Sequence, residues 1–413
     1  MFSNFLEKII KPLEKIAHTS TAAINLGTEL EGDHLDLQTS SPAETPRPHP
    51  GKKIDRYGQQ VDGYWVVGEC QDSPDAYRQR IVKYYTPEGL RISESDSPWY
   101  TREPNDLSII TRDNVRERVF CPMQAPEDPS AICELIQTAS QGNVDNFLTA
   151  IFSMGWVMGC LQAWHKERQT GDRSFPLLNL YGAGSRSARE MALSLIGSEW
   201  MSLAVSAKDL DREGINQLVK TGSHLGSLAI AIDSSVPYDN ISIEELRDMI
   251  RALYHRDAIQ LKSEIDRVHS GILIFSAQPC CGYGEDTELQ KYVIQCPVFT
   301  ETEALVPMQL LEKASASFPR FIALGWQSDG IAEFEQSLCH RLEATPETQL
   351  KMGKLADLAI VGHYARVLLE MANTNASILD WLVKKIKTAI PRLPLRIGKL
   401  SRQNSAIASL LDM

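Results

Sequence analysis

The residues best suited to chemistry stand in one short glycine-containing turn. An apolar run from Phe175 to Tyr181 is typical of a buried strand, and the segment that continues to Gly197 is typical of a helix. Amides at a helix start point at anions, and glycines let the backbone approach them. We expect phosphate or another anion to bind through Gly182, Gly184, Ser185, Arg186, Ser187 and Arg189. The alternative is a simple strand-to-helix turn.

Two further polar residues end apolar runs. Asp233 ends the run SLAIAID, and Gln278 ends the run GILIFSAQ. A strand-end aspartate can bind a metal ion, although the same residue is common in turns and helix caps. Asp233 and Gln278 are therefore candidate catalytic residues, and Asp233 is also the candidate metal ligand.

Arg256 is the third catalytic candidate. With His255 it follows a predicted helix from Ser242 to Tyr254, where it could reach a neighbouring subunit's nucleotide site as an arginine finger. Positive charge also suits the C-terminus of an exposed helix, so the position has a structural explanation as well.

A basic segment near the C-terminus is the strongest charge asymmetry. Seven cations occur there without an acidic residue among them: Lys384, Lys385, Lys387, Arg392, Arg396, Lys399 and Arg402. Such a segment attracts a phosphate backbone without reading its sequence, which makes DNA the predicted partner. The alternatives are an edge strand or a segment that docks on an acidic protein face.

Composition limits the class of protein. The chain has 413 residues and a net charge of -11, so a uniformly basic nucleic-acid coat is excluded, whereas a local basic patch is not. Eight scattered cysteines favour reduced thiols in a cytoplasmic protein, and the pair Cys280-Cys281 alone rarely makes a zinc site. The most apolar stretch, Phe147 to Trp164, contains polar residues, so we expect no transmembrane segment.

The elements that must position these residues fall into five stretches. Residues 1–18 have the spacing of an amphipathic helix, for docking on protein or on a membrane surface, and residues 19–55 have the composition of a flexible linker. Residues 56–122 are a small β-rich module with strand-like runs such as GYWVVGEC, RQRIVKYY and LSIITRD. Residues 123–345 form the α/β domain with the turn, and residues 346–413 form a helical, basic region.

The order of these elements resembles a known family. The helix, FPLL strand and turn of Phe147 to Gly197 are similar to those of helicase-like P-loop ATPases of phages, plasmids and other mobile elements. These proteins are often linked to primases and are related to superfamily-three and AAA+ ATPases. The segments Ser227 to Asp239, Gly271 to Gln278 and Asp286 to Phe299 resemble the family's acidic strand, its sensor strand and its D-L-x-x-R element. The resemblance runs from Phe147 to Leu324 and implies a P-loop core sheet with flanking helices.

Departures from the family pattern fall in three places. With Gly182 as the first glycine of GxxxxGK[ST], Ser187, Ala188 and Arg189 occupy the positions of the second glycine, lysine and hydroxyl residue. Ser234 and Ser235 follow Asp233 where the family has a glutamate that polarises the attacking water. Gln290 or Lys291 stands near the arginine of D-L-x-x-R. The resemblance implies ATP and Mg²⁺ as ligands, but these departures predict impaired hydrolysis.

Three functional hypotheses follow. The first is a catalytically impaired P-loop ATPase-like protein that serves as a DNA-associated assembly or regulatory component in mobile-element replication or defence. The second is an active DNA-dependent ATPase or helicase in which Arg186 or Arg189 replaces the lysine. The third is a structural interaction scaffold that binds a protein partner or a second copy of itself.

Overall fold

Five short apolar segments of the α/β domain form one parallel sheet. In this computed structural model the spatial order is β15-β8-β14-β11-β9. Both faces of this sheet are covered, which explains the almost continuous apolar runs of its strands. The strand bounds are β8 Leu177–Tyr181, β9 Ser202–Leu203, β11 Ala229–Asp233, β14 Gly271–Ser276 and β15 Val293–Pro297. The structure describes residues 51–54, 56–70, 80–100, 122–123, 127–182, 185–196, 202–203, 222–223, 225–233, 243–261, 264–267, 269, 271–276, 288–298, 306–350 and 352–389.

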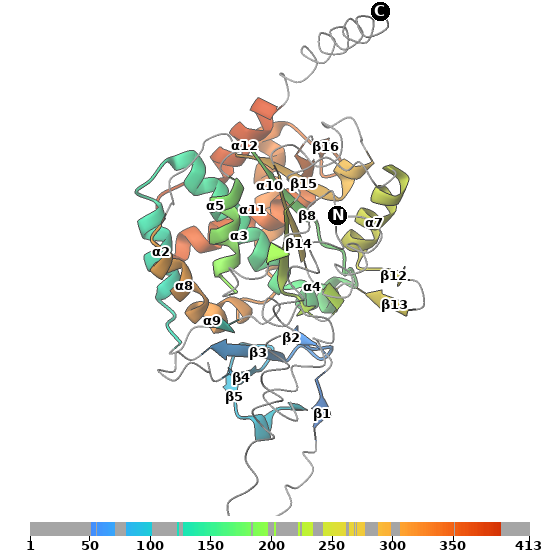
Figure 1. Cartoon of the computed structure of the whole chain (residues 1–413). Helices are drawn as coiled ribbons and strands as arrows, with labels where there is room; N and C mark the ends of the chain where they lie inside the picture. Colours follow the sequence, from blue (N-terminus) through green and yellow to red (C-terminus); the bar gives the residue numbers. More distant parts are fainter. Residues whose placement is uncertain are drawn as a thin grey trace, which may run out of the picture.

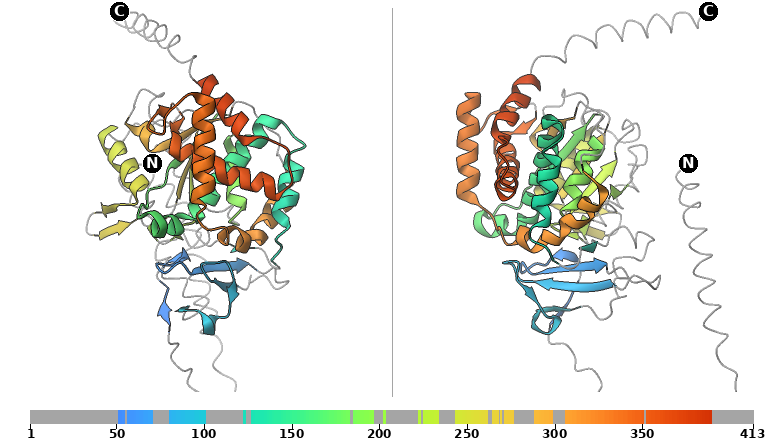
Figure 2. Two further views of the ribbon diagram at one scale, coloured as in Figure 1. Left: turned by 180° about the vertical axis from the view of Figure 1, so that it is seen from behind. Right: turned by 90° about the vertical axis from the view of Figure 1, so that its left-hand side faces the viewer.

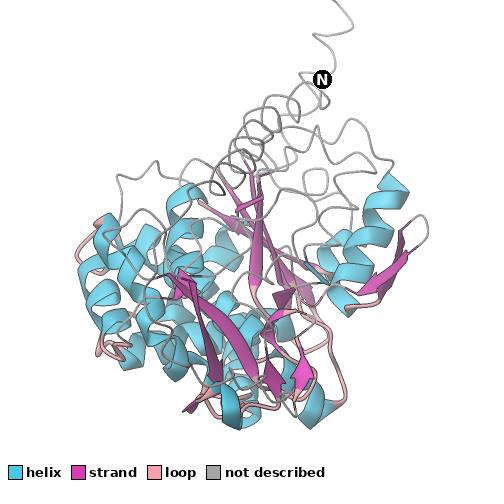
Figure 3. Ribbon diagram, turned by 60° about the horizontal axis from the view of Figure 1, so that its bottom comes forward, coloured by secondary structure: helices cyan, strands magenta, loops and turns pink. Residues whose placement is uncertain are grey.

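The helices cover the two faces of the sheet unequally. Helix α5 (Ser185–Ser194) follows β8, and α7 (Ile243–His255) connects β11 to β14 in the opposite direction across the sheet. Right-handed crossovers therefore place α5 and α7 on opposite faces. Most helices gather on the α5 side, and α7 stands on the other side with the hairpin of β12 (Ala258–Leu261) and β13 (Glu264–Arg267) (Figures 1 and 3).

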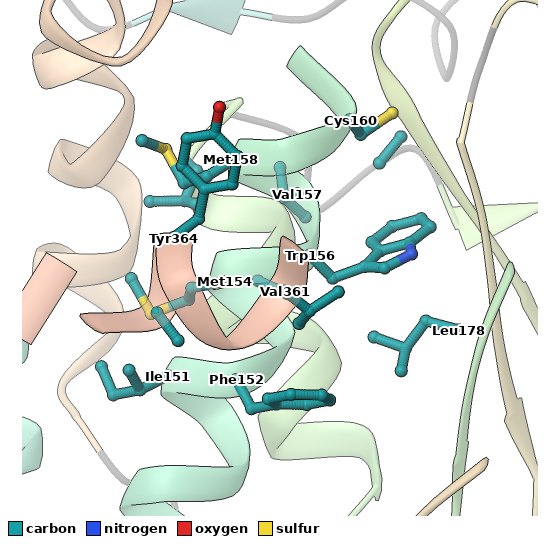
Figure 4. Close-up of a cluster of buried hydrophobic side chains, with 14 of the residues drawn as sticks. Ile151, Phe152, Met154, Trp156, Val157, Met158, Cys160, Leu178, Val361 and Tyr364 are labelled. Carbon is teal, nitrogen blue, oxygen red and sulfur yellow. The ribbon is translucent and has the colours of Figure 1, made fainter. Parts of the chain in front are cut away.

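Helix α3 (Val144–Leu161) is the centre of the helical layer. Its start is capped by the Asn143 side chain, which accepts a hydrogen bond from the Asp145 amide at 2.9 Å. It packs against α5 and against α11 (Leu355–Met371). A Cβ at Gly155 would lie 2.6 Å from the Ala365 amide nitrogen, so glycine lets α3 and α11 cross closely. The side chains between them include Met154, Met158, Val361 and Tyr364 (Figure 4).

Helix α3 is also long and apolar enough to cross a membrane. Its mean hydropathy is 1.3, but 89% of its residues are buried inside the protein. Packing against α5 and α11 accounts for this composition, because a helix enclosed by other helices is apolar on every side. It is the one such helix in the described part of the chain.

The small β module is continued by a strand from the α/β domain. Its sheet has the order β10-β2-β3-β4-β5, and β7 pairs with β3. The strand β10 (Leu225–Gly226) immediately precedes β11 and pairs in parallel with β2. The module forms the lower part of the molecule in Figures 1 and 2. The remaining bounds are β1 Lys52–Lys53, β2 Tyr57–Gln59, β3 Trp65–Cys70, β4 Arg80–Tyr85, β5 Arg91–Ile92, β6 Trp99–Tyr100 and β7 Pro122–Met123.

A large hydrophobic core runs through the described stretches, and a second, small cluster of Val66, Tyr84 and Trp99 lies within the β module. The large core includes Trp65 of the module, Phe152 and Leu178 of the α/β domain, and Tyr364 and Trp381 of the C-terminal region. The large core thus includes residues from both sides of the predicted boundaries at 122/123 and 345/346. The other elements are α2 Ala131–Ala139, α4 Ala163–Thr170, α8 Met308–Ala314, α9 Phe318–Ile322, α10 Ser328–Leu342, α12 Ile378–Ala389, β16 Gln349–Leu350 and β17 Gly353–Lys354.

Several predicted segments lie outside the described residues. These are the amphipathic helix 1–18, nearly all of the linker 19–55, the strand-like run LSIITRD and the pair Cys280-Cys281. The strand-like runs GYWVVGEC and RQRIVKYY contain β3 and β4.

Candidate phosphate-binding site

The carboxyl ends of the parallel strands bring the predicted turn and Asp233 to one edge of the sheet. Tyr181 of β8 is the register partner of Ser276 in β14 and of Pro297 in β15. Asp233, the last residue of β11, pairs with Phe275. Strand β14 thus lies between β8, which leads into the turn, and β11, which ends at Asp233. Ligands of open α/β sheets bind outside this edge, so the arrangement suits an anion site.

Gly182 is required by a close approach of two backbone segments. Its φ is 109°, and a Cβ there would overlap the Val298 carbonyl oxygen. The Val298 amide in turn donates to the Tyr181 carbonyl at 2.8 Å. Burial beside this turn raises the pKa of the Tyr181 phenol to about 12, so the phenol stays neutral at ordinary pH.

Helix α5 begins at Ser185, soon after the end of β8. Its first turns therefore contain Ser187, Ala188 and Arg189. Ala188 is 2% exposed, so the residue at the lysine position of the GxxxxGK[ST] pattern points into the core. The amides of the first helical turn have no partners within the helix and could receive an anion. Residues 183 and 184, and the side chains of Ser185 and Arg186, lie outside the described part of the chain.

The Arg189 guanidinium is bound to its neighbour in sequence. One of its nitrogens lies 3.2 Å from Glu190 Oε1, and the arginine side chain is 11% exposed. A paired and largely enclosed guanidinium is poorly placed to replace a lysine that must reach a terminal phosphate.

Arg256 lies in the interior of the protein at the opposite edge of the sheet. It is 6% exposed, with Nη2 at 3.9 Å from Cys160 Sγ and the guanidinium over the Phe175 ring. The Phe175 amide donates to the Tyr254 carbonyl, which places the end of α7 at the start of β8. Burial lowers the pKa of Arg256. The arginine-finger hypothesis does not fit this position, because an enclosed guanidinium cannot reach a neighbouring subunit.

The predicted basic segment divides into buried and exposed lysines. Lys385 is 6% exposed, and its ammonium lies 2.7 Å from Asp145 Oδ2 and 3.5 Å from the Pro297 carbonyl. The Trp381 indole donates to the same carboxylate at 2.9 Å. Lys385 therefore links α12 to the carboxyl edge of the sheet. An enclosed and paired ammonium does not suit the DNA contact that the sequence predicts for this residue. Lys384 and Lys387 are exposed.

Other predicted residues have no described site geometry. Gln278, Arg392, Arg396, Lys399 and Arg402 lie outside the described residues, as does the Asp233 side chain. Lys291 precedes β15, at the amino edge of the sheet, and pairs with Glu288 at 2.6 Å. The described part of the chain contains no cluster of three or more His, Cys, Asp or Glu residues that could hold a metal ion.

A buried polar network lies at the amino edge of the sheet, and no pattern in the sequence predicts it. The Tyr254 hydroxyl donates to Asp357 at 3.3 Å and accepts from the Lys354 ammonium at 3.2 Å. Burial raises the pKa of Asp357 to about 7. Tyr254 is 100 positions from Lys354 and 103 positions from Asp357, so only the tertiary contact between α7 and the start of α11 reveals the network.

Comparisons with known proteins add little to this geometry. No protein-family model matches the chain, and no curated protein sequence matches it. Among solved structures, the active helicase Cch of SCCmec type IV aligns with a TM-score of 0.44 and 11% identity, over 78% of this chain and 59% of that chain. A full-length MCM homolog from Methanopyrus kandleri aligns with a TM-score of 0.37 and 11% identity, over 76% and 69%. Similarity at this level does not establish a family or an activity.

Proposed function

We propose that this chain is a catalytically impaired P-loop ATPase-like protein. The observation that carries the proposal is the turn from β8 to α5, which has the position of a phosphate-binding loop but directs Ala188 into the core. Hydrolysis depends on a lysine at the terminal phosphates and on a Ser or Thr oxygen on magnesium. Helix amides and Gly182 remain, and they can hold an anion weakly without this chemistry.

The protein acts, in this proposal, as a DNA-associated assembly or regulatory component. Lys384 and Lys387 are exposed on α12, and Arg392, Arg396, Lys399 and Arg402 follow it in the sequence. Positive charge in one segment of an acidic chain favours contact with a phosphate backbone. The link to mobile-element replication or defence rests on the resemblance of residues 147–324 alone.

Steady-state ATP turnover, with and without single-stranded DNA, tests the impaired chemistry. We expect a rate no higher than that of the Asp233→Ala variant under both conditions. Turnover that DNA stimulates and that Asp233→Ala abolishes would establish the active ATPase instead. The pairing of Arg189 with Glu190 weighs against that alternative.

A gel-shift titration at several salt concentrations tests the DNA role. Neutralising Lys384, Lys387, Arg392, Arg396, Lys399 and Arg402 together should abolish a salt-dependent shift. Lys313→Met on α8, another exposed lysine, is the matched control and should leave the shift unchanged. Loss of Z phosphate contacts should lower the slope of log K against log salt by about 0.7Z for single strands. An unchanged shift in the neutralised variant would favour the protein-interaction scaffold.

A further inference from the structure

The inner face of the β module presents two buried hydrogen-bond donors to the helical layer. Gln59 of β2 and Trp65 of β3 are register partners and are 4% and 1% exposed. The Gln59 Oε1 atom accepts from Ser227 Oγ at 2.8 Å, but its Nε2 has no hydrogen-bond partner in the described structure. The Trp65 indole Nε1 also has none.

A buried acceptor lies on the other side of this interface. Gln162 follows the last residue of α3 and is 0% exposed. Its Nε2 donates to the Phe321 carbonyl at 2.8 Å, whereas its Oε1 has no hydrogen-bond partner among the described residues.

Two chains of contacts connect these three residues across the same interface. Ser227 binds Gln59 through its hydroxyl, and its carbonyl accepts from Cys160 Sγ at 3.3 Å, near the end of α3. The Trp65 ring stands edge-on to Phe318, with 5.3 Å between centroids, and Phe318 is in the same short helix α9 as Phe321. Both chains thus lead from the module to the α3 terminus at Gln162.

From this geometry we infer a buried water site between the β module and the helical layer. The water oxygen accepts from Gln59 Nε2 and Trp65 Nε1, and one of its hydrogens goes to Gln162 Oε1. Buried polar atoms are costly without partners, and buried waters characteristically make about three hydrogen bonds. Two neutral donors and one neutral acceptor at one interface suit a neutral ligand with both roles, rather than an ion.

The inferred water connects the β module to the segment that leads into strand β11. Ser227, which binds Gln59, separates β10 of the module sheet from the approach to β11, whose last residue is Asp233. A water-mediated contact can be nearly as favourable as a direct one. The bound water therefore helps to hold β10 and the start of β11 against α3.

Water-to-indole magnetisation transfer in the full-length protein, labelled with ¹⁵N-tryptophan, tests the inference. The Trp65 indole proton should show a cross-relaxation peak from a long-lived water. Trp156 is the internal control, because its indole is equally buried but donates to the Pro176 carbonyl at 2.8 Å. No peak at Trp65, or equal peaks at both indoles, would overturn the inference. Single Trp→Phe variants assign the two resonances.

A substitution at the acceptor separates a bridging water from an incidental one. Gln162→Met removes Oε1 at similar size and should remove or strongly weaken the Trp65 peak. Gln169→Met is the control, because Gln169 also donates to a carbonyl, that of Trp326, but lies outside this interface. A Trp65 peak of wild-type strength in Gln162→Met would contradict the bridge. If that variant does not fold, the comparison of Trp65 with Trp156 in the wild type decides.

Discussion

At Ala188 the methyl group points into the core, so introducing the lysine of the GxxxxGK[ST] pattern there is expected to fail. Ala188→Lys would force a long charged side chain into a site that is 2% exposed. We expect a loss of about 3 kcal/mol or more in the free energy of unfolding and no gain in ATP binding. Urea denaturation and calorimetric titration measure the two effects. A stable variant that binds ATP more tightly would show that α5 does not begin as described.

Ser187→Lys is the matched control for this prediction. Ser187 is on the same helical turn but is only half-buried. The same lysine should therefore cost clearly less stability there than at position 188.

Asp357 should make the protein less stable as the pH rises. Burial raises its folded-state pKa to about 7, above the ordinary value of 3.8 for an aspartate. The folded state therefore binds more protons than the unfolded state between about pH 4 and 7, so this group's stabilisation falls over that window. Asp357→Asn should flatten this fall and be more stable than the wild type at pH 8, by about 1–3 kcal/mol.

Denaturation curves at pH 4.5 and pH 8 check this prediction. The difference between wild type and variant isolates Asp357 from other titrating groups. Asp329→Asn, an exposed acid in α10, should leave the pH dependence unchanged. Parallel pH profiles for Asp357→Asn and wild type would refute the assignment.

At the scale of elements, Lys385 attaches helix α12 to helix α3, whereas the neighbouring Lys384 does not. Lys385→Met leaves the Asp145 carboxylate without its ammonium partner at the start of α3. The carboxylate side chain is 43% exposed, so water compensates in part, and we expect a loss of about 1–2 kcal/mol. Lys384→Met should change stability by less than about 0.5 kcal/mol. Thermal unfolding compares the stabilities of the two variants. Equal losses of stability would contradict the attachment of α12 through Lys385.

At the scale of the whole molecule, the β module and the core sheet are joined where β10 leads into β11. A Cβ on Gly226 would overlap the Gln59 carbonyl oxygen, which is backbone and cannot turn aside. Gly226→Ala should therefore separate β10 from β2 and speed amide hydrogen exchange in β2 and β11. Gly325→Ala, at a positive φ but in open space, should cause only local strain of about 1 kcal/mol. Unchanged amide hydrogen exchange in β2 would show that the contact between β10 and β2 adjusts to the added methyl group.

The candidate site was partly predictable, because its parts are local patterns. The run around Gly182 predicted a strand, a turn and a helix, and the structure contains β8 and α5 there. Gly182 and Asp233 lie at one edge because β8 and β11 belong to the same parallel sheet, an arrangement that neither local pattern specifies. Arg256 could not be placed from the sequence, because a cation at a helix end can be exposed or enclosed, and only packing against Cys160 and Phe175 distinguishes the two cases.

Periodicity, glycines and residue identity are local properties, so they specify which elements this chain can form and show that its turn lacks the lysine of the GxxxxGK[ST] pattern. Which side chains are enclosed becomes visible only when the elements are packed together. Ala188 faces the core, Lys385 pairs with Asp145 across 240 positions, and β10 joins the module to the core sheet. The physical reason is that burial and pairing depend on what other elements bring to a residue, and that information is distributed along the whole chain.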